Sequence, residues 1–173
     1  MQEKIKSLQR RLQRNVVMPE FVNSISAISN FEIKEAMFLS LEEIDLHNIK
    51  LNSTDFKFNY LNLSFPTEKV SMLKTRLCKL SYELDKENYL SLSHLADLFA
   101  LKTSTAFISE KFQELLDLDR GLIHVYTTDY TNGLWIDQYN DYWFLDGKTE
   151  FVSIIELRVF GEAWIKKVIA FHE

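Results

Sequence analysis

Apolar residues recur at every third or fourth position along several stretches of the chain, which is the pattern of amphipathic helices. The most regular stretch follows Pro66 and predicts a helix over residues 67–85. Its apolar stripe consists of Val70, Leu73, Leu77, Leu80 and Leu84. Residues 19–29 and 31–47 show helical spacing as well, so two further helices are expected ahead of Pro66.

Two glycine turns and an alternating pattern predict the strands. Residues 56–65 alternate between apolar and polar side chains, as a strand does. Asn132-Gly133 and Asp146-Gly147 are hairpin signals, because both turn residues must adopt positive φ. They predict a three-stranded antiparallel meander with strands near 122–128, 134–145 and 148–156. Helical spacing then resumes, and predicts a final helix with Leu157, Phe160, Trp164, Val168 and Phe171.

Between the regular helix and the meander, the sequence predicts two short helices joined by a tight turn. Ser91 or Ser93 would cap the first of them, which carries Leu95, Leu98 and Phe99. The capping residues of 102–105 end it. The second helix would turn its apolar side inward through Ile108, Phe112, Leu115 and Leu116.

The predicted fold class is therefore α+β, with a helix-turn-helix, a three-stranded antiparallel meander and a C-terminal helix in that order. Pro19 and Pro66 are expected to mark boundaries, because proline opens a helix at its first turn. We expect three parts: a basic N-terminal arm over 1–17, a helical segment with one strand over 18–65, and a domain over 66–173.

The domain over 66–173 resembles the winged helix-turn-helix fold. Ala96 stands where that motif needs a small residue, Leu95, Phe99 and Leu101 stand at its core positions, and Ala100 replaces the preferred glycine. In outline the second half is similar to the C-terminal domains of phage antirepressors, through Trp135 and the run 159–165. It is also similar to the winged-helix subunits that partner SMC-like ATPases. The resemblance implies a recognition helix near 104–117.

Length and composition are those of one globular domain. The chain has 173 residues, of which 46% are apolar and 26% charged. The longest apolar runs are broken by charges too soon for a membrane-spanning helix. The N-terminus lacks the apolar core of a signal peptide, and Cys78 stands alone. These features favour a cytoplasmic protein without disulfides.

Charge is distributed unevenly along the chain. The formal net charge is −5, but residues 2–14 carry five basic side chains against one acidic, and residues 110–146 carry eight acidic against two basic. The basic arm could contact nucleic acid or an acidic partner, or self-associate through a seam formed by Ile5, Leu8 and Leu12. The acidic region would attract a basic partner.

A nucleic-acid contact would use the basic arm and the start of the predicted recognition helix. From the arm we expect Lys4, Arg10, Arg11 and Arg14 to contribute. The resemblance adds Thr103, Ser104, Thr105 and Lys111, whose donors suit phosphates and base edges. Glu110 and Glu114 lie on the same helix and oppose phosphate binding. Contact with a protein through this scaffold is the alternative.

Aromatic and acidic residues interleaved along the meander favour a protein-binding surface. The candidates are Tyr130, Trp135, Asp137, Tyr139 and Asp141. Alternation places about half of the aromatic side chains of this region on each face of the sheet. An acidic inhibitor of a basic enzyme, of the immunity-protein or phage-antagonist kind, is therefore a second hypothesis.

A third hypothesis is a Mg²⁺-dependent nuclease. The meander followed by a helix resembles the PD-(D/E)xK nuclease core, in which an aspartate pairs with Glu-x-Lys on the next strand. Asp137 or Asp146 would pair with Glu156, and Arg158 replaces the lysine. The strand that normally completes that core is missing from the pattern.

No glycine-rich phosphate loop, HExxH, paired CxxC or GxSxG motif occurs in the sequence, so no cofactor or metal is predicted. No nucleophile and base stand in a recognisable pattern either. The main prediction is thus a non-catalytic regulatory binding protein of prokaryotic or phage type, acting through a winged-helix-like domain on a protein or DNA partner.

Overall fold

A computed structural model describes residues 2–29, 31–53, 59–83, 87–119 and 121–170. The five α-helices are α1 (Gln2–Ile28), α2 (Leu41–Ser53), α3 (Val70–Glu83), α4 (Thr105–Leu118) and α5 (Glu162–Ala170). The six strands are β1 (Tyr60–Pro66), β2 (Glu87–Leu92), β3 (Leu101–Ser104), β4 (Leu122–Thr127), β5 (Gly133–Leu145) and β6 (Lys148–Phe160). Short 3-10 turns occupy Glu35–Met37, Thr67–Lys69 and Ser93–Leu95. The fold is α+β, as expected.

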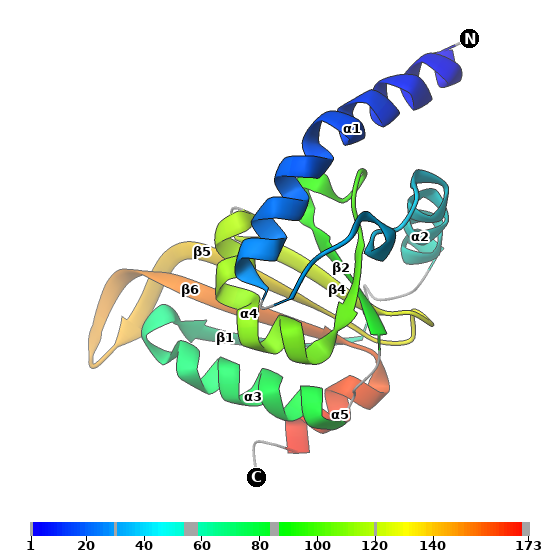
Figure 1. The fold of residues 1–173 in the computed structure, drawn as a ribbon. Coiled ribbons are helices and arrows are strands. Elements are labelled where there is room, and N and C mark those ends of the chain that lie inside the picture. The colour runs from blue at the N-terminus through cyan, green and yellow to red at the C-terminus, as the bar shows by residue number, and fades with distance from the viewer. Residues whose placement is uncertain (1, 30, 54–58, 84–86, 120, 171–173) are drawn as a thin grey trace.

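All six strands form one antiparallel sheet in the order β1-β6-β5-β4-β2-β3. Strands β4, β5 and β6 are consecutive neighbours and begin close to the predicted positions. Asp146 and Gly147 both have positive φ, as predicted, but the turn predicted at Asn132-Gly133 is wrong: the positive φ between β4 and β5 is at Tyr130, and Gly133 is the first residue of β5. They occupy the centre of a larger sheet, because β2 pairs with β4 and β1 pairs with β6. The β5–β6 hairpin is the longest ladder, and its far end extends beyond the rest of the sheet (Figure 1).

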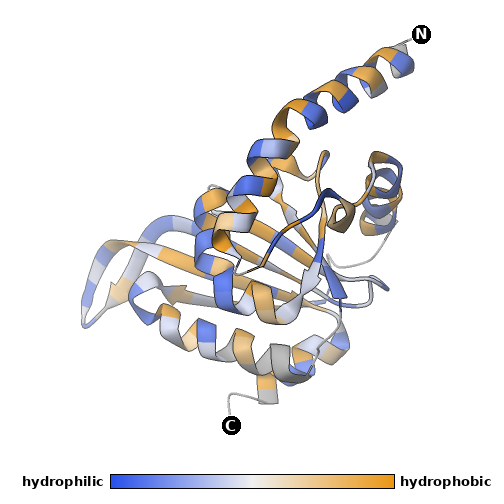
Figure 2. Ribbon diagram, in the orientation of Figure 1, coloured by the Kyte–Doolittle hydropathy of each residue, from blue (hydrophilic) through white to orange (hydrophobic). Residues whose placement is uncertain are grey.

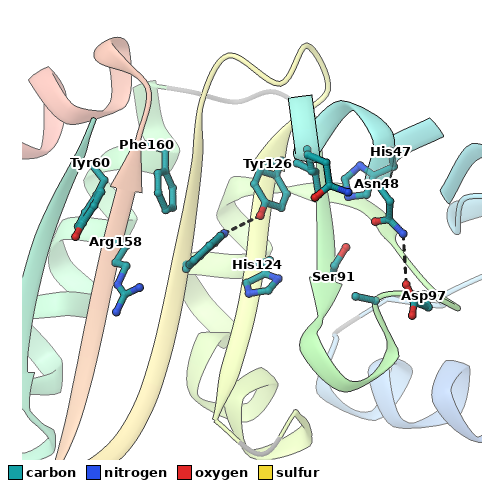
Figure 3. A pocket seen from close by; sticks show the side chains of 13 residues that line it. His47, Asn48, Tyr60, Ser91, Asp97, His124, Tyr126, Arg158 and Phe160 are labelled. Atoms are coloured by element: carbon teal, nitrogen blue, oxygen red, sulfur yellow. Dashed lines mark hydrogen bonds between the residues drawn. The ribbon is translucent and has the colours of Figure 1, made fainter. Parts of the chain in front are cut away.

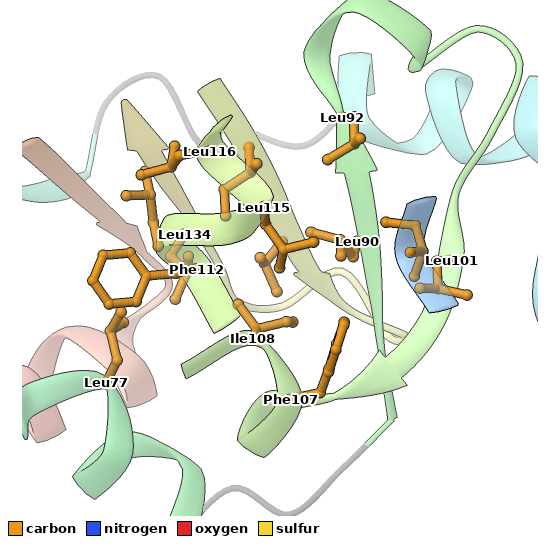
Figure 4. Close-up of a cluster of buried hydrophobic side chains, with 14 of the residues drawn as sticks. Leu77, Leu90, Leu92, Leu101, Phe107, Ile108, Phe112, Leu115, Leu116 and Leu134 are labelled. Atoms are coloured by element: carbon orange, nitrogen blue, oxygen red, sulfur yellow. The ribbon is translucent and has the colours of Figure 1, made fainter. Parts of the chain in front are cut away.

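Helices α3, α4, α5 and the second half of α1 cover one face of the sheet (Figure 1). We call it the covered face. Helix α4 begins where Ser104 caps it by accepting a hydrogen bond from the backbone N–H of Phe107 at 3.2 Å. Its inward stripe contacts side chains from β2, β3 and β5 (Figure 4). Phe112 and Leu115 at the centre of this core are fully buried.

Helix α2 lies against the opposite face and is the one helix of the described residues that covers it. Ser40 and Glu43 form a capping box at its start: the Ser40 N–H donates to Glu43 Oε2 at 2.7 Å and the Glu43 N–H donates to Ser40 Oγ at 3.1 Å. Ile44 packs with Leu39 and Ala100, and Tyr89 of β2 lies against this small cluster. We call this second face the open face.

Residues 87–104 differ most from the prediction. The predicted first helix of a helix-turn-helix is instead the β2–β3 hairpin, with a 3-10 turn at Ser93–Leu95. Ser91 lies within a strand and caps no helix. The reason is the alternation of this run: Leu90 and Leu92 enter the core while Ser91 faces the open side, and the backbone gains two antiparallel neighbours.

The ends of the other helices differ from their predicted positions. Helix α1 continues through Pro19 and across the expected boundary at 17/18, because Met18, Phe21 and Ile25 are buried on both sides of the proline and hold the helix together. The helix predicted over 31–47 begins only at Leu41, after a segment that contains the 3-10 turn Glu35–Met37. Residues 56–58, Leu84 and Phe171, which entered three predictions, lie outside the described residues.

The C-terminal helix also starts later than its spacing predicted, because β6 runs on to Phe160. Gly161 makes the turn with a φ of +85°, and a Cβ there would lie 2.3 Å from the Thr131 carbonyl oxygen. Only glycine fits this turn without moving the neighbouring loop.

Residues 4–16 of α1 project away from the rest of the molecule (Figure 1). Hydrophilic and hydrophobic residues alternate along this part of the helix (Figure 2), and Ile5, Leu8, Leu12 and Val16 are exposed. Within the described residues, no helix is both long and apolar enough to span a bilayer.

Candidate functional site

The strand register lines up side chains of the open face in rows across the sheet. One row of directly paired residues runs through Ser91, His124, Trp135, Arg158 and Asn62. The next row runs through Tyr89, Tyr126, Gly133, Phe160 and Tyr60. Side chains paired in this way have Cβ atoms about 5 Å apart. The register therefore sets a polar row beside an aromatic one.

Helix α2 crosses one end of these rows and leaves a cavity of about 660 Å³ between itself and the sheet (Figure 3). The cavity is lined from α2 by His47, Asn48, Leu51 and Asn52, from the sheet by Tyr60, Ser91, His124, Tyr126, Trp135, Arg158 and Phe160, and from the β2–β3 connection by Ala96 and Asp97. Its volume lies within the range of small-molecule sites.

Ion pairs from α1 hold α2 in this place. Arg10 pairs with Asp45 of α2 and also donates to the carbonyl oxygen of Asp97 at 2.6 Å. Arg11 pairs with Glu42 at 3.0 Å. These contacts connect the projecting helix, the helix over the cavity and the cavity rim.

Aromatic rings form one wall of the cavity. The indole N–H of Trp135 donates to the Tyr126 hydroxyl at 2.7 Å, and the ring centroids of Trp135 and Phe160 lie 4.9 Å apart. Gly133 makes this arrangement possible, because a Cβ there would lie 2.8 Å from both the Tyr126 ring and the carbonyl oxygen of Val125. Burial raises the pKa of Tyr126 to about 12, so its hydroxyl keeps its proton at neutral pH.

His47 lies at the top of the cavity with its ring against three tyrosines. Its ring contacts Tyr89, Tyr126 and Tyr130, and its Nδ1 is 2.8 Å from the Tyr130 hydroxyl. Burial lowers the pKa of His47 to about 4, with smaller contributions from the charges of His124 and Lys50. The imidazole is therefore neutral at pH 7. Its Nε2 is buried and has no hydrogen-bond partner among the described residues.

Ser91 and His124 face each other on neighbouring strands at the base of the cavity. Ser91 is 3% exposed, and its Oγ has no hydrogen-bond partner in the described part of the chain. Burial lowers the pKa of His124 to about 4, opposed by the charge of Asp119, so this imidazole is also neutral. Its ring lies 4.9 Å from that of Trp135. The cavity thus presents neutral hydrogen-bonding groups.

Arg158 lines the far side of the cavity and is already paired. Its Nε donates to Glu156 Oε1, and the other carboxylate oxygen of Glu156 accepts from the Tyr139 hydroxyl at 2.9 Å. Asp137 is the cross-strand neighbour of Glu156. Burial, and then the Glu156 charge, raise the pKa of Asp137. This acidic pair lies beside the cavity, in the adjoining row.

The residues predicted to bind nucleic acid have other contacts. Arg10 and Arg11 pair with α2, and Arg14 donates to the Leu98 carbonyl oxygen at 2.9 Å and lies over the Phe99 ring. Lys4 is exposed on the projecting helix. The expectation of a free basic arm therefore holds for its first turns only.

The second group predicted for nucleic acid does not form a surface. Thr103 and Thr105 are buried, and the Thr105 hydroxyl accepts from Asn88 Nδ2 at 2.7 Å. Ser104 caps α4, and Lys111 pairs with Glu114 at 3.2 Å. Burial corrects the assignment of Thr103 and Thr105, because β3 directs the first into the core and α4 packs the second against the sheet.

The predicted partner-binding residues are divided between two places. Trp135 lines the cavity and Tyr130 holds His47, so both belong to the site described above. Asp137, Tyr139 and Asp141 continue along the open face of β5 toward the far end of the hairpin. The predicted alternation of side chains along β5 is present in the structure. The sequence did not predict that α2 covers the first residues of this strand.

The residues proposed for a nuclease site are only partly together. Asp137 pairs with Glu156 across β5 and β6, whereas Asp146 lies in the turn at the end of the hairpin with a φ of +46°. No group of three histidine, cysteine, aspartate or glutamate side chains able to hold a metal ion occurs within residues 2–29, 31–53, 59–83, 87–119 and 121–170.

Sequence reasoning missed the contribution of α2 and β2. The signal for α2 was present, because Ser40 and Glu43 have capping-box spacing and Ile44, His47 and Leu51 recur on one helix side. The signal for Ser91 was its alternation with Leu90 and Leu92. What placed His47 against Tyr130, 83 residues away, had no local signature.

Comparison with known proteins found no matching family model, no similar curated protein and no similar solved structure.

Proposed function

We propose that this protein is a non-catalytic binding module that takes up a small planar organic molecule in the cavity between α2 and the open face. One observation carries the proposal: two buried polar atoms, His47 Nε2 and Ser91 Oγ, line the same cavity without partners. A buried unpaired polar group costs about 1–3 kcal/mol, and such groups are uncommon in native proteins. A ligand that bonds to both would remove that cost.

The aromatic wall supports the same proposal. Trp135 and Phe160 offer ring surface beside the polar row, and a cavity with aromatic sides and a few polar groups is the usual form of a small-molecule site. A regulatory role would follow if the ligand changed how α2 is held, since α2 also pairs with α1.

The proposal is tested by blocking the cavity. Asn48 on α2 points into it, and its hydrogen bond to Asp97, the one found for this side chain within the described residues, is long at 3.5 Å, so Asn48→Trp fills space at little other cost. Ile49→Trp on the same helix is the matched control, because Ile49 is exposed and does not line the cavity. A mixture of aromatic fragments is screened by saturation-transfer NMR.

We expect fragments that bind the unmodified protein and Ile49→Trp but not Asn48→Trp. If no fragment distinguishes the two tryptophan variants, the cavity is not a binding site and the proposal is wrong.

A second candidate function is binding of a basic protein through the far end of the β5–β6 hairpin. The side chains of Tyr142, Phe144 and Phe151 are 69%, 71% and 62% exposed there. The ring centroids of Tyr142 and Phe151 lie 5.2 Å apart. Asp141, Asp146 and Glu150 lie among them. Exposed aromatic side chains in an acidic setting support the inhibitor hypothesis.

The second candidate is tested by capture from the native host with purified protein as bait. Phe144→Ser should lose a captured partner that Ile49→Ser, an equally exposed position on α2, retains. Equal capture by both variants would remove the hairpin as the contact surface.

A further inference from the structure

His47 offers the cavity one unpaired ring nitrogen. Its Nδ1 lies 2.8 Å from the Tyr130 hydroxyl, and a phenol can donate to a ring nitrogen or accept from it, so this contact fits either tautomer of the neutral imidazole. Nε2 is the buried ring nitrogen that has no partner among the described residues. It is a donor in one tautomer and an acceptor in the other, and a ligand that carries both kinds of group satisfies either.

Ser91 supplies the second contact point, and its distance from His47 suits a ligand with one ring system. His47 packs edge-on against Tyr89, with ring centroids 5.4 Å apart, and Tyr89 and Ser91 lie two residues apart on the same side of β2. Residues so related are about 7 Å apart along a strand. A serine hydroxyl can donate or accept, so it can bond to an N–H or to an oxygen of the ligand.

The charges around the cavity disfavour an ionised ligand. The charged residues that line it are Arg158 and Asp97, and Arg158 is already paired with Glu156. An anion would meet the Asp97 carboxylate, and a cation would meet the Arg158 guanidinium. Both imidazoles that line the cavity are neutral at pH 7, for the reason of burial given above. The unpaired groups are therefore matched by neutral partners.

We infer that the cavity takes a neutral, planar, one- or two-ring compound bearing a carboxamide or lactam group, whose N–H and carbonyl oxygen bond to His47 Nε2 and Ser91 Oγ. The inference rests on the proposed function and specifies it. The ring lies along the Trp135 and Phe160 wall, and the amide faces the two unpaired atoms.

The test compares three probes that share one ring system: indole-3-carboxamide, indole-3-carboxylate, which has the same number of non-hydrogen atoms, and indole. Dissociation constants are measured by NMR titration at pH 7. We expect the amide to bind about tenfold more tightly than either of the others, because it alone satisfies both buried groups without bringing a charge. Carboxylate binding as tight as that of the amide would overturn the inference and leave the cavity a binding site.

Two pairs of variants locate the contacts. Ser91→Ala should weaken binding of the amide about tenfold and leave binding of indole unchanged. Ser64 of β1 is also on the open face but does not line the cavity, so Ser64→Ala should change the binding of neither compound. His47→Gln keeps an N–H near the Nε2 position and should retain the amide preference, and His47→Leu should lose it. If Ser91→Ala and His47→Leu leave the preference intact, the assignment of the contacts is wrong.

Failure of the inference can be told apart from failure of the proposed function. If none of the three probes binds, a neutral amide is not the ligand. The fragment comparison between Asn48→Trp and Ile49→Trp decides separately whether the cavity binds anything at all.

Discussion

The two faces of the sheet are built from the same strands and yet differ in how their polar groups are satisfied. On the covered face, Leu134, Leu157 and Val159 pack under α3, α4 and α5 in a continuous apolar core. On the open face, the alternate positions of the same strands carry Trp135, Arg158 and Phe160, and a single helix covers part of them. The covered face is filled, whereas the open face contains a cavity.

This difference indicates which face serves stability and which serves binding. A protein that needed only a second core could have filled the space under α2 with apolar side chains. Instead His47 and Ser91 stand there buried and unpaired, at a cost to the folded state. Groups that lower stability without a structural benefit are expected where a ligand binds.

The largest effect of a single substitution should come from the covered face. Phe112→Ala removes a fully buried ring at the centre of the core and should lower the free energy of unfolding by about 3–5 kcal/mol. Phe144→Ala, which removes an exposed ring from the end of the hairpin, should change it by no more than about 0.5 kcal/mol. Urea unfolding measures both. Similar losses would mean that the two regions do not differ as described.

Acid should destabilise the open face specifically. The pKa values of His47 and His124 fall from 6.5 to about 4 on folding, so only the unfolded chain binds protons between these values. Stability is complete above pH 6.5 and is lost as pH falls toward 4, by on the order of 3 kcal/mol for each histidine. The double variant His47→Gln with His124→Gln should lose less stability over this range. An unchanged pH profile would contradict the buried, neutral state of both rings.

Gly133 offers a way to disturb the aromatic wall without touching the covered face. Gly133→Ala would bring a methyl group within 2.8 Å of the Tyr126 ring, and should cost about 1–3 kcal/mol. The indole N–H resonance of Trp135 should shift as its hydrogen bond to Tyr126 is strained. Gly147→Ala, in the open turn of the hairpin, is strained by its own φ of +84° but should leave that resonance in place. The same Trp135 indole N–H shift in both variants would contradict the packing of Gly133 against Tyr126 in the aromatic wall.

The smallest expected effect has the opposite sign. Ser91→Ala removes a buried hydroxyl that has no partner, so it should raise the free energy of unfolding by about 1 kcal/mol and Tm by about 2–4 °C. Ser109→Ala is the contrasting control, because the Ser109 hydroxyl donates to the Ala106 carbonyl oxygen at 2.9 Å, and its loss should not stabilise. A loss of stability in Ser91→Ala would show that the hydroxyl has a structural role in the free protein.

Local sequence patterns predicted an element correctly where the residues that form it lie in one short segment. Helix α4 follows from the spacing of Ile108, Phe112 and Leu115, and its start follows from a capping serine. The turn at Asp146-Gly147 forms with positive φ at both residues, as predicted, and separates β5 from β6. In each of these cases the interacting residues are close together in the chain, so a short window holds the information.

The same reasoning failed for residues 87–104. Serines and leucines there suit a capped helix as well as a strand, and the choice was made by β4, whose Ile123 and Val125 pair opposite Leu92 and Leu90. Likewise the basic residues of α1 suggested a free arm, but the carboxylates of α2 occupy Arg10 and Arg11. A sequence shows the charge of a side chain and not the partner that neutralises it.

The sequence by itself determined an α+β chain, the regular helices α3 and α4, the turn at Asp146-Gly147 and the aromatic side of β5, because periodicity and glycine conformation act over a few residues. Tertiary structure alone decided that β2 joins the sheet beside β4 and that α2 crosses its open face. The cavity depends on both events, since it brings His47 of α2 together with Ser91 of β2 and with Tyr130. Contacts over such separations are stabilised by the whole packed fold, and no short stretch of sequence specifies them.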